Sequence, residues 1–274
     1  MNRQRLVWLI GAVLGVLAVG GIWWTLQPHD RAWARVTTSG EVIFATDATY
    51  FPFAMIDANG AMFGFDIDLG RALAAQMGLT ARFDQVGYDG LIGALTVRRA
   101  DVVLSAFVAD DSRLHEVAYS TPYFNAGTLL ILPAESAPVS SGAALRWAEG
   151  RTLAAVYGSQ GDVILRQWAR RVVGVTPLAL PDEADALQAV LNGQADGALV
   201  DSVLAYAVLQ NEPGLQVSAA LDNVPYVLAV HVHSRRLLDE LNRALAELDR
   251  AGTLAALRAE WFGPAAADVY WAVE

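Results

Sequence analysis

The sequence predicts an α/β fold with two mostly parallel β-sheets. From Glu41 onward, short strand-like runs alternate with amphipathic helical patterns, as expected where helices connect parallel strands. The chain has 274 residues, 54% of them apolar, so it can bury a substantial core in each of two lobes. The expected strands are 42–46, 101–105, 128–132, 152–156, 197–200 and 227–231. The expected helices are 66–77, with Asp66 as a candidate N-cap, 161–172, 183–192 and 236–250.

An uncharged apolar run occupies residues 6–26 and follows two arginines. Because a positive flank stays in the cytoplasm, this pattern predicts an exported, periplasmic protein. The run is about long enough to cross a bilayer, and Trp23 and Trp24 suit a membrane interface, which favours an uncleaved anchor. The small residues at 18–20 equally suit cleavage by a signal peptidase. Residues 1–27 are therefore expected to be either a signal peptide or an inner-membrane anchor.

Composition excludes several classes of function. The net charge is −10, and the basic residues, all of them arginine, are scattered among acids, which argues against a nucleic-acid surface. Cysteine is absent, so disulfides, thiol nucleophiles and a lipid-bearing cysteine are excluded. His231 and His233 alternate along one strand, but two histidines supply too few ligands for a metal. We therefore expect neither a metal nor another cofactor.

Several stretches of the sequence resemble the polar amino-acid-binding proteins of ABC transporters, periplasmic solute-binding protein family 3, in their residues, their order and their spacing. The resemblance covers roughly residues 41–263 and rests on 45–53 (ATDATYFPF), 64–69 (GFDIDL), 88–95 (YDGLIGAL), 101–113, 116–123, 155–159, 191–201 and 252–263.

The resemblance implies a type II periplasmic binding fold, or Venus flytrap, in which two crossing strands join two lobes. Lobe 1 would comprise 41–126 and 230–264, lobe 2 would comprise 127–229, and residues 265–274 would form a tail. A small amino-acid-like ligand would bind in the cleft between the lobes. The partner would be an ABC transporter permease.

A free amino acid is a zwitterion, so its site must offer a cation to the carboxylate and an anion to the ammonium. Arg113 matches the carboxylate-binding arginine of the family, and a guanidinium can hold two oxygens at once. Asp201 follows an expected strand and matches the ammonium-binding aspartate. Ser159 precedes an expected helix, whose N-terminal amides can hold a carboxylate. The alternatives are a surface ion pair for Arg113 and a helix cap for Asp201.

Four further residues are implied by the resemblance. Tyr50 and Tyr88 match aromatic positions on either side of the ligand side chain, and Ser105 matches a serine that contacts the ligand. Asp47 matches a residue that contacts a basic or amide side chain in some relatives, which predicts a polar or cationic amino acid. The alternative for Asp47 is a turn, in which its carboxylate bonds the backbone nearby. Val108 stands where a hydroxyl residue is usual, which leaves the identity of the ligand open.

Two other functions fit the same fold. One is an enzyme that resembles periplasmic cyclohexadienyl dehydratase, with Asp47 or Asp110 as a general acid if burial raises its pKa. No stretch typical of that enzyme is found, so we expect a binding protein and not an enzyme. The other is a sensory module that acts through a separate partner polypeptide.

Overall fold

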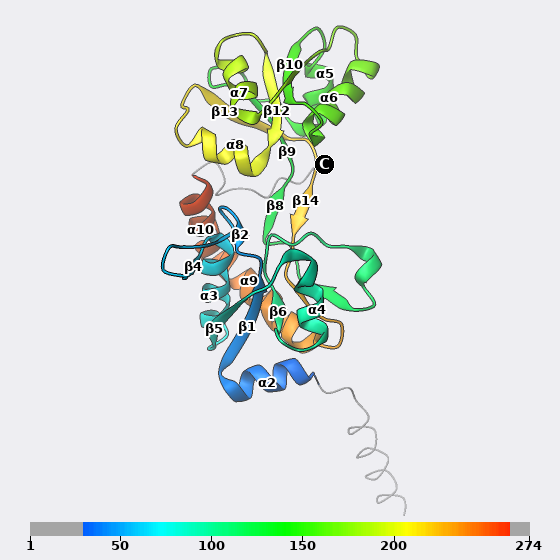
Figure 1. Cartoon of the computed structure of the whole chain (residues 1–274). Helices are drawn as coiled ribbons and strands as arrows, with labels where there is room; N and C mark the ends of the chain where they lie inside the picture. Colours follow the sequence, from blue (N-terminus) through cyan, green and yellow to red (C-terminus); the bar gives the residue numbers. More distant parts are fainter. Residues whose placement is uncertain (1–29, 264–274) are drawn as a thin grey trace, which may run out of the picture.

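The computed structural model describes residues 30–263, which form two lobes joined by a pair of strands (Figure 1). This architecture confirms the predicted two-lobed α/β fold. The expected signal peptide or anchor at 1–27 and the tail at 265–274 lie outside the described residues. Within 30–263, no helix combines the length and the hydropathy that crossing a bilayer requires.

Lobe 1 is built on a five-stranded sheet with the strand order β5-β1-β6-β15-β7. Its strands are β1 (Glu41–Thr46), β5 (Thr80–Gln85), β6 (Val102–Val103), β7 (Val117–Tyr119) and β15 (Ala229–His231). Its helices are α2 (Arg31–Ser39), α3 (Phe65–Gln76), α4 (Leu91–Thr96), α9 (Arg235–Arg250) and α10 (Thr253–Phe262). A small sheet adds β2 (Thr49–Tyr50), β3 (Ala54–Ile56) and β4 (Met62–Phe63).

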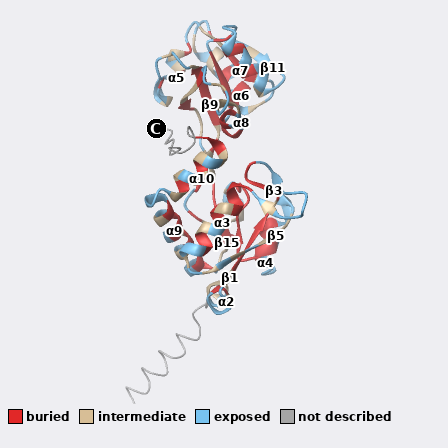
Figure 2. Cartoon of the chain, turned by 90° about the vertical axis from the view of Figure 1, so that its left-hand side faces the viewer, coloured by how far each residue is buried: buried red, intermediate tan, exposed pale blue. Residues whose placement is uncertain are grey.

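Lobe 2 is built on a second five-stranded sheet with the strand order β11-β10-β12-β9-β13. Its strands are β9 (Thr128–Pro133), β10 (Thr152–Val156), β11 (Thr176–Leu180), β12 (Gly197–Asp201) and β13 (Leu215–Ala220). Its helices are α5 (Ser141–Trp147), α6 (Gln160–Arg171), α7 (Glu183–Leu191) and α8 (Ser202–Leu209). Figure 2 shows buried residues along the elements of both lobes.

Both sheets are mixed, whereas the sequence predicted mostly parallel ones. In lobe 1, β1 is parallel to β5 and β6, but β15 is antiparallel to β6 and β7. In lobe 2, β10 is parallel to β11 and β12, but β9 is antiparallel to β12 and β13. The reason is the path of the chain between the lobes. β9 and β15 each enter their lobe from the other lobe, so each begins at the end of its sheet nearest the crossing strands. Their neighbours in the sheet run the other way and finish at that end.

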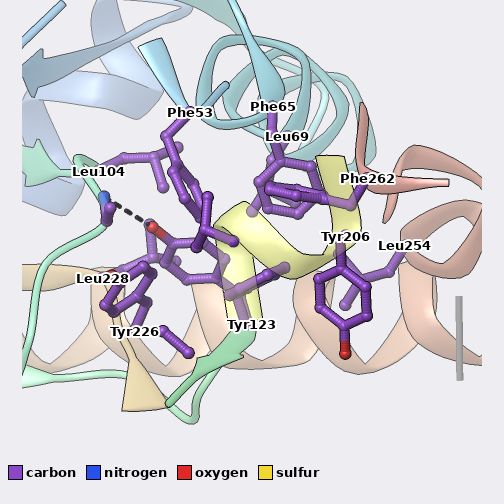
Figure 3. Packing of buried hydrophobic residues seen from close by; sticks show 14 of the residues in the cluster. Phe53, Phe65, Leu69, Leu104, Tyr123, Tyr206, Tyr226, Leu228, Leu254 and Phe262 are labelled. Carbon is purple, nitrogen blue, oxygen red and sulfur yellow. Dashed lines mark hydrogen bonds between the residues drawn. The ribbon is translucent and has the colours of Figure 1, made fainter. Parts of the chain in front are cut away.

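Two antiparallel strands, β8 (Phe124–Ala126) and β14 (Val224–Tyr226), cross between the lobes. Their lobe-1 ends are held by a cluster of aromatic rings (Figure 3). Phe53 contacts Phe124 edge-on at 5.2 Å and Tyr226 at 5.3 Å, and Phe262 of α10 lies 4.7 Å from Phe124, all measured between ring centroids. Such pairs stabilise by about 0.5–1.5 kcal/mol each beyond the area they bury. The crossing strands are therefore firmly anchored in lobe 1.

The start of α3 differs from the prediction, because Asp66 is not the N-cap. Gly64 occupies that position with φ of +133°, and a Cβ there would lie 2.2 Å from the carbonyl oxygen of Phe53. Asp66 lies inside the first turn and is fully buried. Its Oδ2 accepts a 2.7 Å hydrogen bond from the backbone amide of Ala106. The close approach of the Phe53 segment shifts the helix start to Phe65 and buries the aspartate.

Candidate functional site

Three of the predicted site residues lie in loops that follow the parallel strands of lobe 1. Asp47 follows β1, Tyr88 follows β5 and Ser105 follows β6, so all three lie at the carboxyl edge of the sheet, where open α/β sheets bind ligands. The amide of Asp47 donates to Ser105 Oγ at 3.0 Å, and the amide of Tyr88 donates to Asp47 Oδ2 at 2.9 Å. The structure thus joins these three predicted residues into one hydrogen-bonded group.

The carboxylate of Asp47 is engaged on both oxygens. In addition to the Tyr88 amide on Oδ2, the Thr49 hydroxyl donates to Oδ1 at 2.8 Å. The alternative role, a turn in which the carboxylate bonds the backbone nearby, differs from this geometry, because one partner is a side chain and the other is the amide of Tyr88 in a different loop. Asp47 holds the loops after β1 and β5 together, so its negative charge is already partly balanced by donors from the protein.

The two predicted aromatic residues are both accessible but pack on different neighbours. Tyr50 is 44% exposed and stacks on Phe53, with ring centroids 5.3 Å apart. Tyr88 is 47% exposed and lies 5.6 Å from the ring of Phe107. Burial raises the pKa of Tyr50, whose hydroxyl is hydrogen-bonded to Tyr226 of β14. Tyr50 therefore links the lobe-1 face to a crossing strand.

Arg113 ends a short 3₁₀ helix, and its side chain is 42% exposed. Its Nη2 pairs with Glu116 at 3.0 Å, while its Nε is buried and has no hydrogen-bond partner among residues 30–263. A buried donor without a partner costs about 1–3 kcal/mol, so an incoming acceptor at Nε would be favourable. No ion pair or hydrogen bond within the described chain joins Arg113 to lobe 2, so the structure does not bring it together with Asp201.

A cavity of about 210 Å³, formed by lobe 2 and the crossing strands, brings together Ser159 and Asp201. The cavity is lined by Ala126, Gly127, Thr128, Ser159, Gln160, Gly161, Asp201, Asp222, Val224 and Tyr226. Ser159 is the N-cap of α6, and its hydroxyl accepts from the amide of Asp162 at 3.2 Å. A Cβ on Gly161 would lie 2.4 Å from the carbonyl oxygen of Leu199. The glycine therefore allows the positive end of α6 to lie directly against β12.

Asp201 both caps a helix and lines the cavity. Its Oδ1 accepts from the amides of Val203 and Leu204, at 2.9 and 3.4 Å, at the start of α8. Desolvation by the surrounding protein raises the pKa of Asp201, and the negative charges of Glu183 and Asp222 raise it further. The capping alternative is thus present, yet the carboxylate also faces the space available to a ligand.

Two lining residues were missed by the sequence analysis. Asp222 accepts from the Thr128 amide at 2.5 Å and from the Thr128 hydroxyl at 3.2 Å, which fixes its carboxylate beside Asp201. Tyr226 comes from β14 and carries the hydroxyl that meets Tyr50. Both precede or lie within a crossing strand, and no strand-end pattern marks them. Among residues 30–263, no cluster of three or more His, Asp or Glu side chains is suited to a metal.

Comparison with known proteins finds relatives among bacterial amino-acid-binding proteins. The chain is 26% identical to the L-cystine-binding protein TcyJ of Escherichia coli strain K12 over 266 residues, covering 96% of each protein. It is 28% identical to the ABC transporter arginine-binding protein 1 of the same strain, covering 81% of this chain and 90% of that one.

Solved structures share the fold. The L-cystine solute receptor of Neisseria gonorrhoeae, in its unliganded open conformation, superposes with a TM-score of 0.74 at 23% identity, covering 85% of this chain and 97% of that one. An ancestral cationic amino acid solute-binding protein superposes with a TM-score of 0.61 at 27% identity, covering 84% and 98%. The model of the bacterial extracellular solute-binding proteins, family 3, matches residues 42–264. The chain therefore belongs to the bacterial extracellular solute-binding proteins, family 3.

Proposed function

We propose that this chain binds an amino acid with a second cationic group in the cleft between its lobes and delivers it to an ABC importer. The observation that carries the proposal is the lobe-2 cavity, which is lined by both Asp201 and Asp222 together with residues at the start of α6. A single ammonium needs one carboxylate partner. A second carboxylate in the same cavity favours a ligand with a further positive charge, such as arginine, lysine or the diamino acid cystine.

The ligand carboxylate would bind on the other side of the cleft. Arg113 retains a buried Nε without a partner among the described residues, and a guanidinium matches a carboxylate in shape and charge. Within the lobe-2 cavity itself, Ser159 and the amides at the start of α6 offer a second set of donors to which the carboxylate could bind once the lobes close. Two of the relatives named above are described as L-cystine- and arginine-binding proteins, which supports a ligand of this class.

Binding requires the two faces to approach, and we propose that they close about β8 and β14. In this proposal lobe 1 comprises 41–126 and 230–264 and lobe 2 comprises 127–229. The separation of Arg113 from Asp201 and the likeness to an unliganded open receptor support an open resting state. We further propose that residues 1–27 direct export, as a cleaved signal or as an anchor in the inner membrane.

Calorimetric titration of the full chain with arginine, lysine, cystine, glutamine and glutamate tests the ligand class. We expect the first three to bind more tightly than glutamate. Asp222→Asn should weaken dicationic ligands at least about tenfold while affecting glutamine less, because a neutral side chain loses no charge pair. Asp239→Asn, at an exposed position on α9, makes the same change in charge and should bind as the wild type does. Preference for glutamate, or equal losses for arginine and glutamine, would contradict the proposed ligand class.

Catalysis has less support than binding. Asp110 accepts hydrogen bonds from Ser112, which lower the pKa of its carboxyl, and Asp47 is engaged with Thr49 and Tyr88. A general acid at neutral pH requires a raised pKa instead. Incubation with prephenate or arogenate should therefore give no aromatic product, and turnover would overturn the assignment as a binding protein.

A further inference from the structure

A second cavity lies in lobe 1 and is lined in part by residues of α2. This helix lies at the end of lobe 1 that is farthest from lobe 2 (Figure 1). It has a volume of about 40 Å³, several times the roughly 10–15 Å³ that one water requires but too small for an amino acid. Its lining residues are Arg31, Ala32, Arg35, Leu95, Arg98, Ala100, Asp101, His231 and Ser234. We propose that this cavity is a binding site for a phosphate-type oxyanion, free or carried by a lipid headgroup.

The charge at the cavity is positive although the whole chain carries −10. Arg31 and Arg98 make no ion pair or hydrogen bond through their side chains within 30–263. Arg35 pairs with Asp101, through Nε at 2.8 Å and through Nη2. The same carboxylate also accepts from the amide of Ile43 at 2.8 Å, so it is fully engaged. Among the lining residues, three arginines against one aspartate leave an excess of two positive charges, and Asp30 and Glu41 just outside the lining offset part of it. The remaining positive charge attracts an anion.

Ser234 provides an observation independent of the arginines. Its side chain is only 5% exposed, it lines the cavity, and its hydroxyl has no hydrogen-bond partner in the described part of the chain. This hydroxyl is not one of the fully buried side-chain atoms that lack a partner within 30–263, so it keeps some contact with solvent and is free to donate. An oxyanion in the cavity would accept the proton of this hydroxyl.

Ser234 is also the N-cap of α9, a helix of 16 residues without an acidic residue in its first turn. The carboxylate of Asp30 partly balances the positive end of this helix, so the helix dipole adds only weakly to the attraction. One amide of this turn is already used, since Leu237 donates to Asp30 Oδ2 at 3.1 Å. The Asp30 carboxylate does not line the cavity, so it leaves the Ser234 hydroxyl free for the anion.

His231 contributes a further donor. Its Nδ1 accepts from the amide of His233 at 3.2 Å, so in the neutral ring the proton is on Nε2. Burial lowers the pKa of His231, and the nearby His233 and Arg98 lower it further. These effects favour the neutral ring, which can still donate one hydrogen bond from Nε2 to an oxyanion.

A substitution of Arg98 can separate loss of anion binding from loss of folding, because the Arg98 backbone has φ of +59° at the end of α4. Glycine is favoured in this left-handed conformation, whereas a side chain costs about 1–2 kcal/mol there. Arg98→Gly therefore removes one guanidinium from the cavity and also removes the cost of holding a side chain in the left-handed conformation. Loss of anion binding in this variant would not reflect loss of folding.

The experiment is thermal unfolding of the full chain in increasing sodium phosphate, compared with sodium chloride of equal ionic strength. For the wild type we expect phosphate to raise Tm by about 2–4 °C more than chloride at about five times its dissociation constant. Arg98→Gly and Arg31→Ala should lose this excess, with Arg98→Gly unfolding no earlier than wild type in chloride. Arg250→Ala, at an exposed position at the far end of α9, should keep it.

Sedimentation with vesicles separates the two sources of the anion. Stronger binding to phosphatidylcholine vesicles that contain phosphatidylglycerol than to phosphatidylcholine alone, lost in Arg98→Gly, would identify a lipid headgroup. A phosphate effect on Tm without this preference would identify a free oxyanion. The proposal is overturned if phosphate and chloride act alike and the vesicles show no preference that depends on Arg98. It is also overturned if the variants at Arg98 and Arg31 keep the full effect.

Discussion

The buried carboxyl of Asp66 should make the stability of this protein fall as pH rises from acidic to neutral. Burial raises the pKa of Asp66 from its ordinary 3.8 to about 7, and the hydrogen bonds from Ala106 and Tyr123 offset only part of that rise. Its Oδ1 has no hydrogen-bond partner among residues 30–263, which also favours the protonated form. The neighbouring Tyr123 immediately precedes β8, so this carboxyl lies next to a crossing strand.

The sign follows from comparing the two states. Below pH 4 the carboxyl is protonated in both the folded and unfolded chains, and its contribution is fully present. Between pH 4 and 7 the folded chain holds a proton that the unfolded chain has released, so raising the pH favours unfolding. A rise of about 3 pKa units corresponds to about 4 kcal/mol over the whole window, and about 2–3 kcal/mol of that falls between pH 5 and 8.

Asp66→Asn removes the titration while keeping an oxygen that can accept from the Ala106 amide. The free energy of unfolding of both proteins is measured by urea unfolding at pH 5 and at pH 8. The value for the variant minus the value for wild type should be about 2–3 kcal/mol larger at pH 8 than at pH 5. Other titrating groups, such as Asp201 and His231, are present in both proteins and cancel in this difference. Asp239→Asn, an exposed control, should show no such change with pH. A difference between Asp66→Asn and wild type that is independent of pH would refute the reasoning.

Four further outcomes are expected. Arg113→Lys should weaken amino-acid binding at least about tenfold in calorimetry, because an ammonium cannot hold a carboxylate through two parallel bonds; unchanged affinity would remove Arg113 from the site. Asp47→Asn should lower the urea midpoint by an amount equivalent to about 1 kcal/mol without changing the preference between arginine and glutamate, whereas a switch of preference would restore its role in specificity. Gly161→Ala should cost about 1–3 kcal/mol in the same assay, because its Cβ would meet the Leu199 carbonyl, and a neutral effect would show that α6 can shift. Solution scattering should give a smaller radius of gyration with saturating ligand, and an unchanged radius would argue against closure about β8 and β14.

The sequence determined the elements whose signals are local. The alternation of strand and helix patterns predicted α6 and α7 to within one residue at each end, and the ordered stretches that resemble the family predicted the two-lobed fold. Residues that directly follow parallel strands could also be foreseen at the cleft, because the carboxyl ends of such strands share one edge. Ser159 and Asp201, which the structure brings into one cavity, are examples.

Tertiary structure decided what depends on residues far apart in the chain. Asp222 lies beside Asp201 because Thr128, 94 residues away, fixes its carboxylate through two hydrogen bonds. Asp66 resembles a helix cap in sequence, yet the approach of the Phe53 carbonyl moves the helix start and buries it. The cavity beside α2, for which we propose an oxyanion, likewise combines residues from α2, the end of α4 and the start of α9. Periodicity and propensity report the conformation of a segment, whereas the partners of a polar side chain, and thus its pKa and its role, are set only when the sheets and helices pack together.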